Sequence, residues 1–358
     1  MLTVEQERSL PVELDVDRPI HVGTFSANGE YLAGWDWRSV GVWRVEGGKQ
    51  MATMEAFQVQ CLAVSNDGRW IAAGTSLGDT LVWDANTYEQ VFAHREAFQH
   101  IRRFRGVHFS PDSTRLISAS DSRTAIVWDI ATHRKVQTLH HDEVAAANYS
   151  PQGDRIATAS GHVVRVWDSN DGHLLVEIRV KMSPWYNTGL LWFHNHLFVL
   201  SKGEIKEFDA STGSALSEWS VPGADFRSCI ALPKHGEFVA CSTESSITFW
   251  DTSTHRELGV IQTTENPSIA FSPDSQFLVI GGEGRKITVQ SLSHIYVSIV
   301  SLWNMTYVNM FLAPLAIPNR IQSHPLVYNT LSRNLTFRST TLRWIHGNTI
   351  SSQTRRRY

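Results

Sequence analysis

Residues 105–129 read RGVHFSPDSTRLISASDSRTAIVWD, and this stretch decides the fold. It contains three short apolar segments, and turn-forming residues separate each segment from the next. The first turn runs from Ser110 to Ser113, and proline at its second position fixes φ at a value that suits a turn. Segments this short, without a helical period, predict antiparallel β-strands, the third of which ends at Trp128-Asp129.

The same pattern recurs along the chain, and the pair of residues that ends the third strand returns every 39–45 residues. The pairs are Trp43-Arg44, Trp83-Asp84, Trp128-Asp129, Trp167-Asp168, Phe208-Asp209, Trp250-Asp251 and Val289-Gln290. In the third repeat a fourth strand follows, from Lys135 to Leu139. One four-stranded sheet cannot bury both of its faces alone, whereas sheets stacked radially around an axis can. We therefore expect these aromatic residues to pack in the core.

The repeats resemble the WD40 family, in which a Trp-Asp ending recurs at this period in the blades of a propeller. The resemblance covers roughly residues 12–292 and implies an all-β fold, a seven-bladed β-propeller, over residues 1–292. Residues 293–358 are then an irregular tail. Family members usually complete the last blade with an N-terminal strand, and residues 11–16 alternate in the way that such a strand requires. Residues 296–300 alternate as well and are the alternative candidate for the fourth strand of the last blade.

Family members also share a hydrogen-bonded network of Trp, Ser or Thr, His and Asp, and this sequence departs from it. Asp36 and Asp121 lie seven residues before their tryptophans instead of six, and Leu77 and Gly161 replace the aspartate in the second and fourth repeats. The candidate histidines for the network are His21, His94, His100 and His141. We therefore expect a divergent propeller whose fifth and seventh blades are the least regular.

What the resemblance implies about function is a non-catalytic scaffold that binds other proteins. Family members usually recognise partners on the face that carries the blade-to-blade connections and the turns between second and third strands. Trp, Tyr and Arg dominate the binding energy of protein interfaces. The candidate partner-binding residues on these loops are Trp35, Trp37, His100, Arg103, Arg123, Trp185 and Tyr186. The alternatives are packing for the aromatic residues and a solvated loop for the basic ones.

The net charge and two sequence motifs bear on nucleic-acid binding, hydrolysis and metal binding, and they argue against all three. Residues 1–299 carry 25 Lys and Arg against 35 Asp and Glu, a net charge of −10 that repels nucleic acid. Residues 74–78 match the G-x-S-x-G pattern of hydrolases but lie between two strands. His194 and His196 lack a third metal ligand nearby. We expect no catalysis, cofactor, metal site or nucleic-acid partner; an enzyme with a central-channel site is the less favoured alternative.

The C-terminal tail has a different composition. Residues 300–358 contain seven arginines and no Asp, Glu or Lys. Three interpretations of this tail stay open. The first is a membrane anchor in residues 297–317, which would make the protein a membrane-tethered adaptor. The alternatives are a segment that docks under the propeller or onto a partner, and an end without a selected fold. Three widely spaced cysteines and the absence of a secretory signal favour a reducing compartment, so we expect the protein in the cytoplasm or the nucleus. Separately, we expect it to be a monomer.

Overall fold

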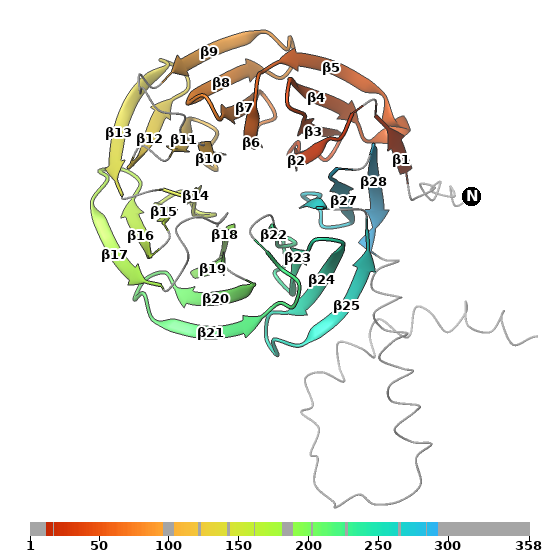
Figure 1. Ribbon diagram of the computed structural model, residues 1–358. Coiled ribbons are helices and arrows are strands. Elements are labelled where there is room, and N and C mark those ends of the chain that lie inside the picture. The colour runs from red at the N-terminus through yellow and green to blue at the C-terminus, as the bar shows by residue number, and fades with distance from the viewer. Residues whose placement is uncertain are drawn as a thin grey trace, which may run out of the picture. The chain divides into compact units, whose positions relative to one another are not determined.

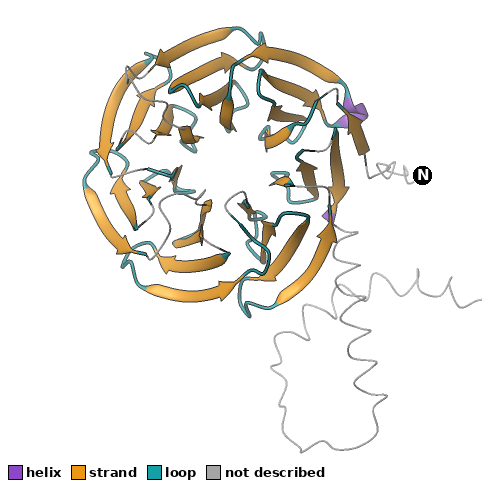
Figure 2. Ribbon diagram, viewed as in Figure 1, coloured by secondary structure: helices purple, strands orange, loops and turns teal. Residues whose placement is uncertain are grey.

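The structure is a computed structural model that describes residues 12–16, 18–95, 104–120, 123–141, 144–160, 162–180, 189–201, 203–225, 228–263, 266–283 and 285–292. It shows seven four-stranded antiparallel sheets, the blades, arranged around a central axis (Figure 1). Strands make up nearly all of the regular structure, and the longest helical element described is the short turn η1 (Glu46–Gly48) (Figure 2). The predicted seven-bladed β-propeller is confirmed.

Each of the first six blades runs from its innermost to its outermost strand in chain order. Blades one to three are β2 (His21–Phe25), β3 (Tyr31–Trp35), β4 (Ser39–Arg44), β5 (Gln50–Glu55); β6 (Val59–Val64), β7 (Trp70–Thr75), β8 (Asp79–Asp84), β9 (Gln90–Arg95); and β10 (Phe104–Phe109), β11 (Arg115–Ser120), β12 (Thr124–Asp129), β13 (Arg134–His140). Blades four to six are β14 (Ala146–Tyr149), β15 (Arg155–Ala159), β16 (Val163–Asp168), β17 (Leu174–Arg179); β18 (Gly189–Phe193), β19 (His196–Ser201), β20 (Glu204–Asp209), β21 (Ala215–Ser220); and β22 (Ile230–Ala231), β23 (Phe238–Ser242), β24 (Ser246–Asp251), β25 (Glu257–Gln262). Blade seven is β26 (Ser268–Phe271), β27 (Phe277–Gly281), β28 (Lys286–Ser291) and, outermost, β1 (Val12–Asp15).

The ring is closed by strands from opposite ends of the described chain. β1 pairs antiparallel with β28, with Val12 opposite Val289 and Asp15 opposite Lys286. The Lys286 ammonium also donates a hydrogen bond to the Glu13 carboxylate at 2.6 Å. The N-terminal strand is therefore the fourth strand of blade seven; residues 296–300, its rival, lie outside the described residues.

The aromatic residue at the end of each third strand lies in the core between blades. Its exposed fraction is 8% or less in the first six blades, at Trp43, Trp83, Trp128, Trp167, Phe208 and Trp250. Three of these indoles donate a hydrogen bond within their own blade, Trp128 to Ser118 and Trp167 to Thr158 at 2.8 Å and Trp250 to Thr248 at 2.9 Å. This part of the family network is retained, and Val289 takes the equivalent place in blade seven.

The aspartate that follows the aromatic residue folds the turn into the fourth strand. In blade five the Asp209 carboxylate accepts hydrogen bonds from the backbone N–H groups of Ser211 and Thr212, both at 2.8 Å. The Gly213 N–H then donates to the Asp209 carbonyl at 2.8 Å, which closes the turn four residues on. The residue at this fourth position has a positive φ in all five blades with the aspartate, at Tyr88, His133, Gly172, Gly213 and His255, and also at Gly48 after Arg44 in blade one. The aspartate thus stabilises a turn that contains a left-handed residue.

These turns make the fold sensitive to acid. Backbone hydrogen bonds from Asn86 and Thr87 lower the pKa of Asp84, and side-chain and backbone bonds from Thr132 lower that of Asp129. Since the folded pKa lies below the unfolded value of about 3.9, the stabilisation is complete above that pH and is lost as pH falls through the folded pKa. We expect the free energy of unfolding, measured in urea by tryptophan fluorescence, to decrease below about pH 4.

Asparagine substitution tests the source of this acid sensitivity, because an amide oxygen still accepts hydrogen bonds but does not titrate. The double variant Asp84→Asn, Asp129→Asn should lose less stability between pH 5 and pH 3, about the range in which aspartates titrate. Glu30→Gln removes an exposed carboxylate and serves as the control. If the double variant and the control have the same pH dependence as the original chain, the turns are not the source.

The sequence predicts blades five and seven to be the least regular, but blade six has the shortest inner strand. The shortest inner strand is β22 in blade six, with two residues, because Pro233 follows it closely and has no N–H to continue the pairing. Blade five has strands of five or six residues, and its irregularity is a two-residue first turn in which His194 has a φ of 52°. In blade seven the irregular feature is Val289 in place of an aromatic residue.

All described residues belong to the first of two units of the chain, residues 1–305. The second unit, residues 306–358, lies outside them, as does the whole of the predicted tail, residues 293–358. The boundary at residue 292 therefore stays a prediction. Within the described part of the chain no helix is long and apolar enough to cross a membrane.

Candidate partner-binding face

The up-and-down order of strands gives the propeller two unlike faces. The blade-to-blade connections and the turns between second and third strands end on one face, which we name the upper face. The other turns, including those that begin with the aspartates at the ends of third strands, lie on the lower face. The upper face includes Trp35 at the end of β3, Trp37 in the turn between β3 and β4, and Arg123 between β11 and β12.

A cavity of about 1310 Å³ opens on the upper face. Residues from blades six, seven, one and two line it, so no single blade forms it. Blade one and the segment before it contribute the most side chains: Arg18, Pro19, His21, Trp35, Asp36, Trp37 and Arg38. Asn266, Pro267 and Glu283 line the side that belongs to blade seven.

Asp36 organises the turn between the two tryptophans. Its carboxylate is 8% exposed and accepts hydrogen bonds from the Arg38 N–H at 2.7 Å and the Ser39 N–H at 2.6 Å. Burial alone raises the pKa of Asp36, but these bonds, the Ser39 hydroxyl and the nearby Arg18 guanidinium outweigh it and hold that pKa below its usual value. The carboxylate is therefore ionised at neutral pH and fixes the backbone around Trp37.

The two tryptophans of this turn have different surroundings. Trp35 is partly buried and packs on the His21 ring, with 5.7 Å between ring centroids. Burial lowers the pKa of His21, and the negative charge of Glu283 opposes this only in part, so the ring that supports Trp35 is neutral at pH 7. Trp37 is 67% exposed. Of the two residues, Trp37 is the one available to a partner.

Two further exposed apolar side chains lie in upper-face loops that backbone hydrogen bonds connect to the Trp37 turn. Phe57 is 58% exposed in the connection from blade one to blade two, and Leu77 is 42% exposed in the turn between β7 and β8. The Gln58 N–H donates to the Trp37 carbonyl at 2.8 Å, and the Ser76 N–H donates to the Gln58 carbonyl at 2.9 Å. These bonds place the three segments side by side. We name Trp37, Phe57 and Leu77 the apolar patch.

The structure brings only some of the predicted partner-binding residues together. Trp35 and Trp37 share the cavity, whereas Arg123 is exposed in blade three, has a φ of 67° and does not line the cavity. His100, Arg103, Trp185 and Tyr186 lie outside the described residues. The sequence analysis missed Phe57 and Leu77; the available signal was that both lie in connections of the same loop types as Trp37.

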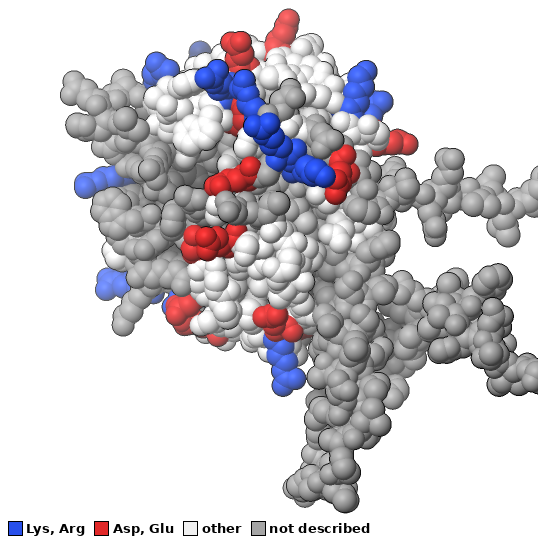
Figure 3. All heavy atoms as spheres, turned by 45° about the vertical axis from the view of Figure 1, so that its right-hand side comes forward, with Lys and Arg blue, Asp and Glu red and all other residues white. Residues whose placement is uncertain are grey.

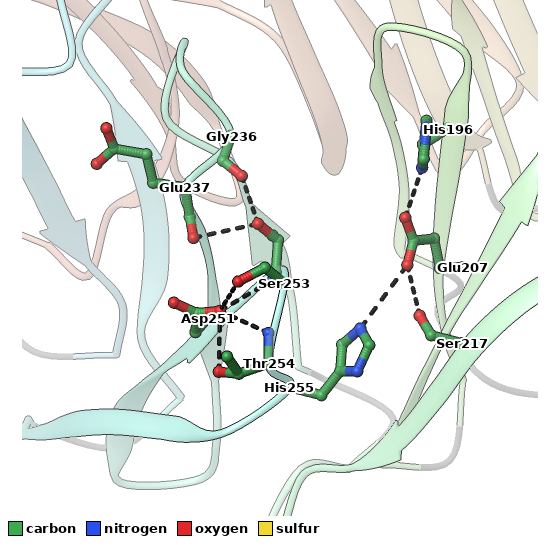
Figure 4. Close-up of polar contacts among 10 residues, drawn as sticks. His196, Glu207, Ser217, Gly236, Glu237, Asp251, Ser253, Thr254 and His255 are labelled. Carbon is green, nitrogen blue, oxygen red and sulfur yellow. Dashed lines mark hydrogen bonds and ion pairs between the residues drawn. The ribbon is translucent and has the colours of Figure 1, made fainter. Parts of the chain in front are cut away.

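A second polar cluster, at the junction of blades five and six, is drawn in Figure 4. The Glu207 carboxylate is 8% exposed, accepts a hydrogen bond from the Ser217 hydroxyl and lies 2.5 Å from Nδ1 of His196. Nε2 of His255, from blade six, lies 3.8 Å from the same carboxylate, and the His255 ring stacks on Trp219 of blade five. The cluster links neighbouring blades at the lower-face ends of their strands and is structural.

Comparison with known proteins places these features in context. A family model described as "WD domain, G-beta repeat" matches residues 48–84, 91–129 and 133–168. WD repeat-containing protein 1 of Mus musculus is 35% identical over 81 residues, which are 23% of this chain and 13% of that protein. Autophagy-related protein 16 of Arabidopsis thaliana is 24% identical over 227 residues, 59% of this chain and 43% of that protein. The chain thus spans less than half of the length of these curated relatives.

Solved structures give the same result for the fold. A chain in the "Crystal Structure of Mitotic Checkpoint Complex" has a TM-score of 0.67 and 17% sequence identity, and the match covers 81% of this chain and 94% of that chain. At this identity the likeness concerns the fold alone.

Proposed function

The chain belongs to the WD40-repeat family, and from this premise we propose that it is a non-catalytic scaffold that binds protein partners through its upper face. The propeller fold fits a role in protein interaction. The observation that carries the more specific proposal is the apolar patch, of which Trp37 lines the cavity.

The physical argument concerns water-exposed apolar surface. Single exposed apolar residues are common, but three large ones in adjacent loops form a surface that a partner can cover. A tryptophan buries about 150–250 Å² when it is fully covered, and Trp37 keeps most of its surface available. The hydrogen bonds around Asp36 hold the Trp37 backbone in place, so binding orders little that is not already ordered.

The test compares Trp37→Ala with the original full-length chain in affinity purification from native cells, read by mass spectrometry. We expect the recovery of specific partners to fall at least about tenfold, the effect of losing an interface hot spot. Leu216→Ala is the matched control, because Leu216 is 49% exposed on the outer strand β21, away from the upper face. Equal recovery by all three proteins would show that the upper face near Trp37 is not the binding site.

We also propose that the scaffold is a monomer in a reducing compartment, the cytoplasm or the nucleus. Burial raises the pKa of Cys61 to about 12 and raises the pKa of Cys241 as well, so both remain protonated thiols at neutral pH. Light scattering on the purified chain tests the monomer, and microscopy of the tagged chain tests the compartment. A stable dimer or a secreted chain contradicts the respective proposal.

A further inference from the structure

We infer that the upper-face cavity binds an extended peptide segment in which an apolar side chain lies close to a carboxylate. The inference rests on the proposed function and adds the chemistry of the partner. It combines the apolar patch, through Trp37, with two arginines that line the cavity together with Trp37, namely Arg18 and Arg38.

Both guanidinium groups can accept a new partner. Arg38 is exposed, and its side chain makes no hydrogen bond or ion pair with any residue that the structure describes. The Arg18 side chain is 55% exposed, and its one contact among those residues is with Asp36 at 3.5 Å. The other Asp36 oxygen already accepts shorter bonds from the turn. Each guanidinium carries five N–H donors in a geometry that suits a carboxylate.

The charges around these arginines indicate at which side of the cavity a carboxylate is favoured. The propeller region carries a net charge of −10, so two weakly paired cations beside one cavity differ from the average surface. Acidic and basic side chains are interspersed on the side of the propeller seen in Figure 3. Glu283 lines the cavity on the blade-seven side and repels a carboxylate there. An acidic side chain is therefore favoured at blade one, next to Arg18 and Arg38.

The apolar and basic groups are close enough for one short segment to reach both. The Ala56 N–H donates to the Arg38 carbonyl at 3.0 Å, and the Gln58 N–H donates to the Trp37 carbonyl at 2.8 Å. Phe57 lies between these two donors in sequence, so its backbone runs beside Trp37 and Arg38. An extended peptide advances about 3.3 Å per residue, and its carboxylate should therefore lie within a few residues of its apolar side chain.

The test is selection of random 12-residue peptides, displayed on phage, by the immobilised full chain and by Arg38→Gln, Arg18→Gln and Arg134→Gln. Arg134 is exposed on β13 and is the matched control. We expect the original chain and the control to enrich Asp or Glu within about three residues of an aromatic or aliphatic side chain. This enrichment should be lost on Arg38→Gln and reduced on Arg18→Gln, and a selected peptide should bind about 5–10-fold more weakly after Glu→Gln substitution.

Several results overturn the inference: no enriched peptides, enriched peptides without acidic residues, or acidic enrichment that persists in both arginine variants. Trp37-dependent capture of cellular proteins separates the two levels of the proposal. If capture occurs but no acidic-apolar peptide is selected, the partner chemistry is wrong and the scaffold stands. If neither occurs, the proposed function fails together with the inference.

Discussion

Deletion of residues 1–16 is expected to lower the free energy of unfolding by about 3–5 kcal/mol, the size of effect that follows when several interactions are lost together. The deleted segment contains β1, the outermost strand of blade seven (Figure 1). Four residues of β1 pair with β28, so deletion leaves the outer edge of β28 unpaired. It also removes the contact between strands that lie more than 270 positions apart in the chain. Urea unfolding, followed by circular dichroism, measures the change.

The control separates strand pairing from surface charge. Glu13→Gln removes the 2.6 Å ion pair with Lys286, in which both side chains are more than half exposed. Exposed pairs contribute about 0–1 kcal/mol, so this substitution should have a small effect. If the deletion costs no more than Glu13→Gln, the N-terminal strand does not hold the ring closed, and blades one and seven are joined mainly by their other contacts, such as the bridge between Ile20 and Gly282.

The features predicted from the sequence are those whose physical causes are local. The turn from Asp84 to Tyr88 takes five residues, and the aspartate, its backbone donors and the left-handed residue all lie within it. The turn recurs in five blades, and together with the period of the third-strand endings it predicts the blades and their number. The short β22 also has a local cause in Pro233, and the sequence analysis missed it by attending to the aromatic positions alone.

The candidate site was predicted less completely, because it depends on contacts between blades. Trp35 and Trp37 stand two positions apart in one turn, and only the packing of Trp35 on His21, 14 positions earlier, separates their roles. The loops of Phe57 and Leu77 are connected to the Trp37 turn by hydrogen bonds of their neighbours Gln58 and Ser76. No pattern within a single repeat reports how neighbouring loops pair, so the apolar patch could be found only in the folded chain.

Trp128→Ala is expected to destabilise the propeller by about 3–5 kcal/mol, as for other large aromatic residues removed from a core. Trp128 is 4% exposed and packs against blade two, with ring centroids 4.5 Å from His94 and 5.3 Å from Phe92. Its indole also donates a hydrogen bond to the Ser118 hydroxyl at 2.8 Å. Alanine removes the contact between blades and leaves the hydroxyl without this donor, so the two losses add.

Two further substitutions separate these contributions. Trp128→Phe keeps much of the ring but removes the N–H donor, and it should cost about 1–3 kcal/mol. Trp37→Ala should change the free energy of unfolding by less than about 0.5 kcal/mol, because Trp37 is 67% exposed. Urea unfolding followed by circular dichroism suits all three, since each variant loses a fluorescent tryptophan. If Trp37→Ala costs as much as Trp128→Ala, then Trp37 supports the fold, and lost partner capture in that variant no longer indicates a binding site.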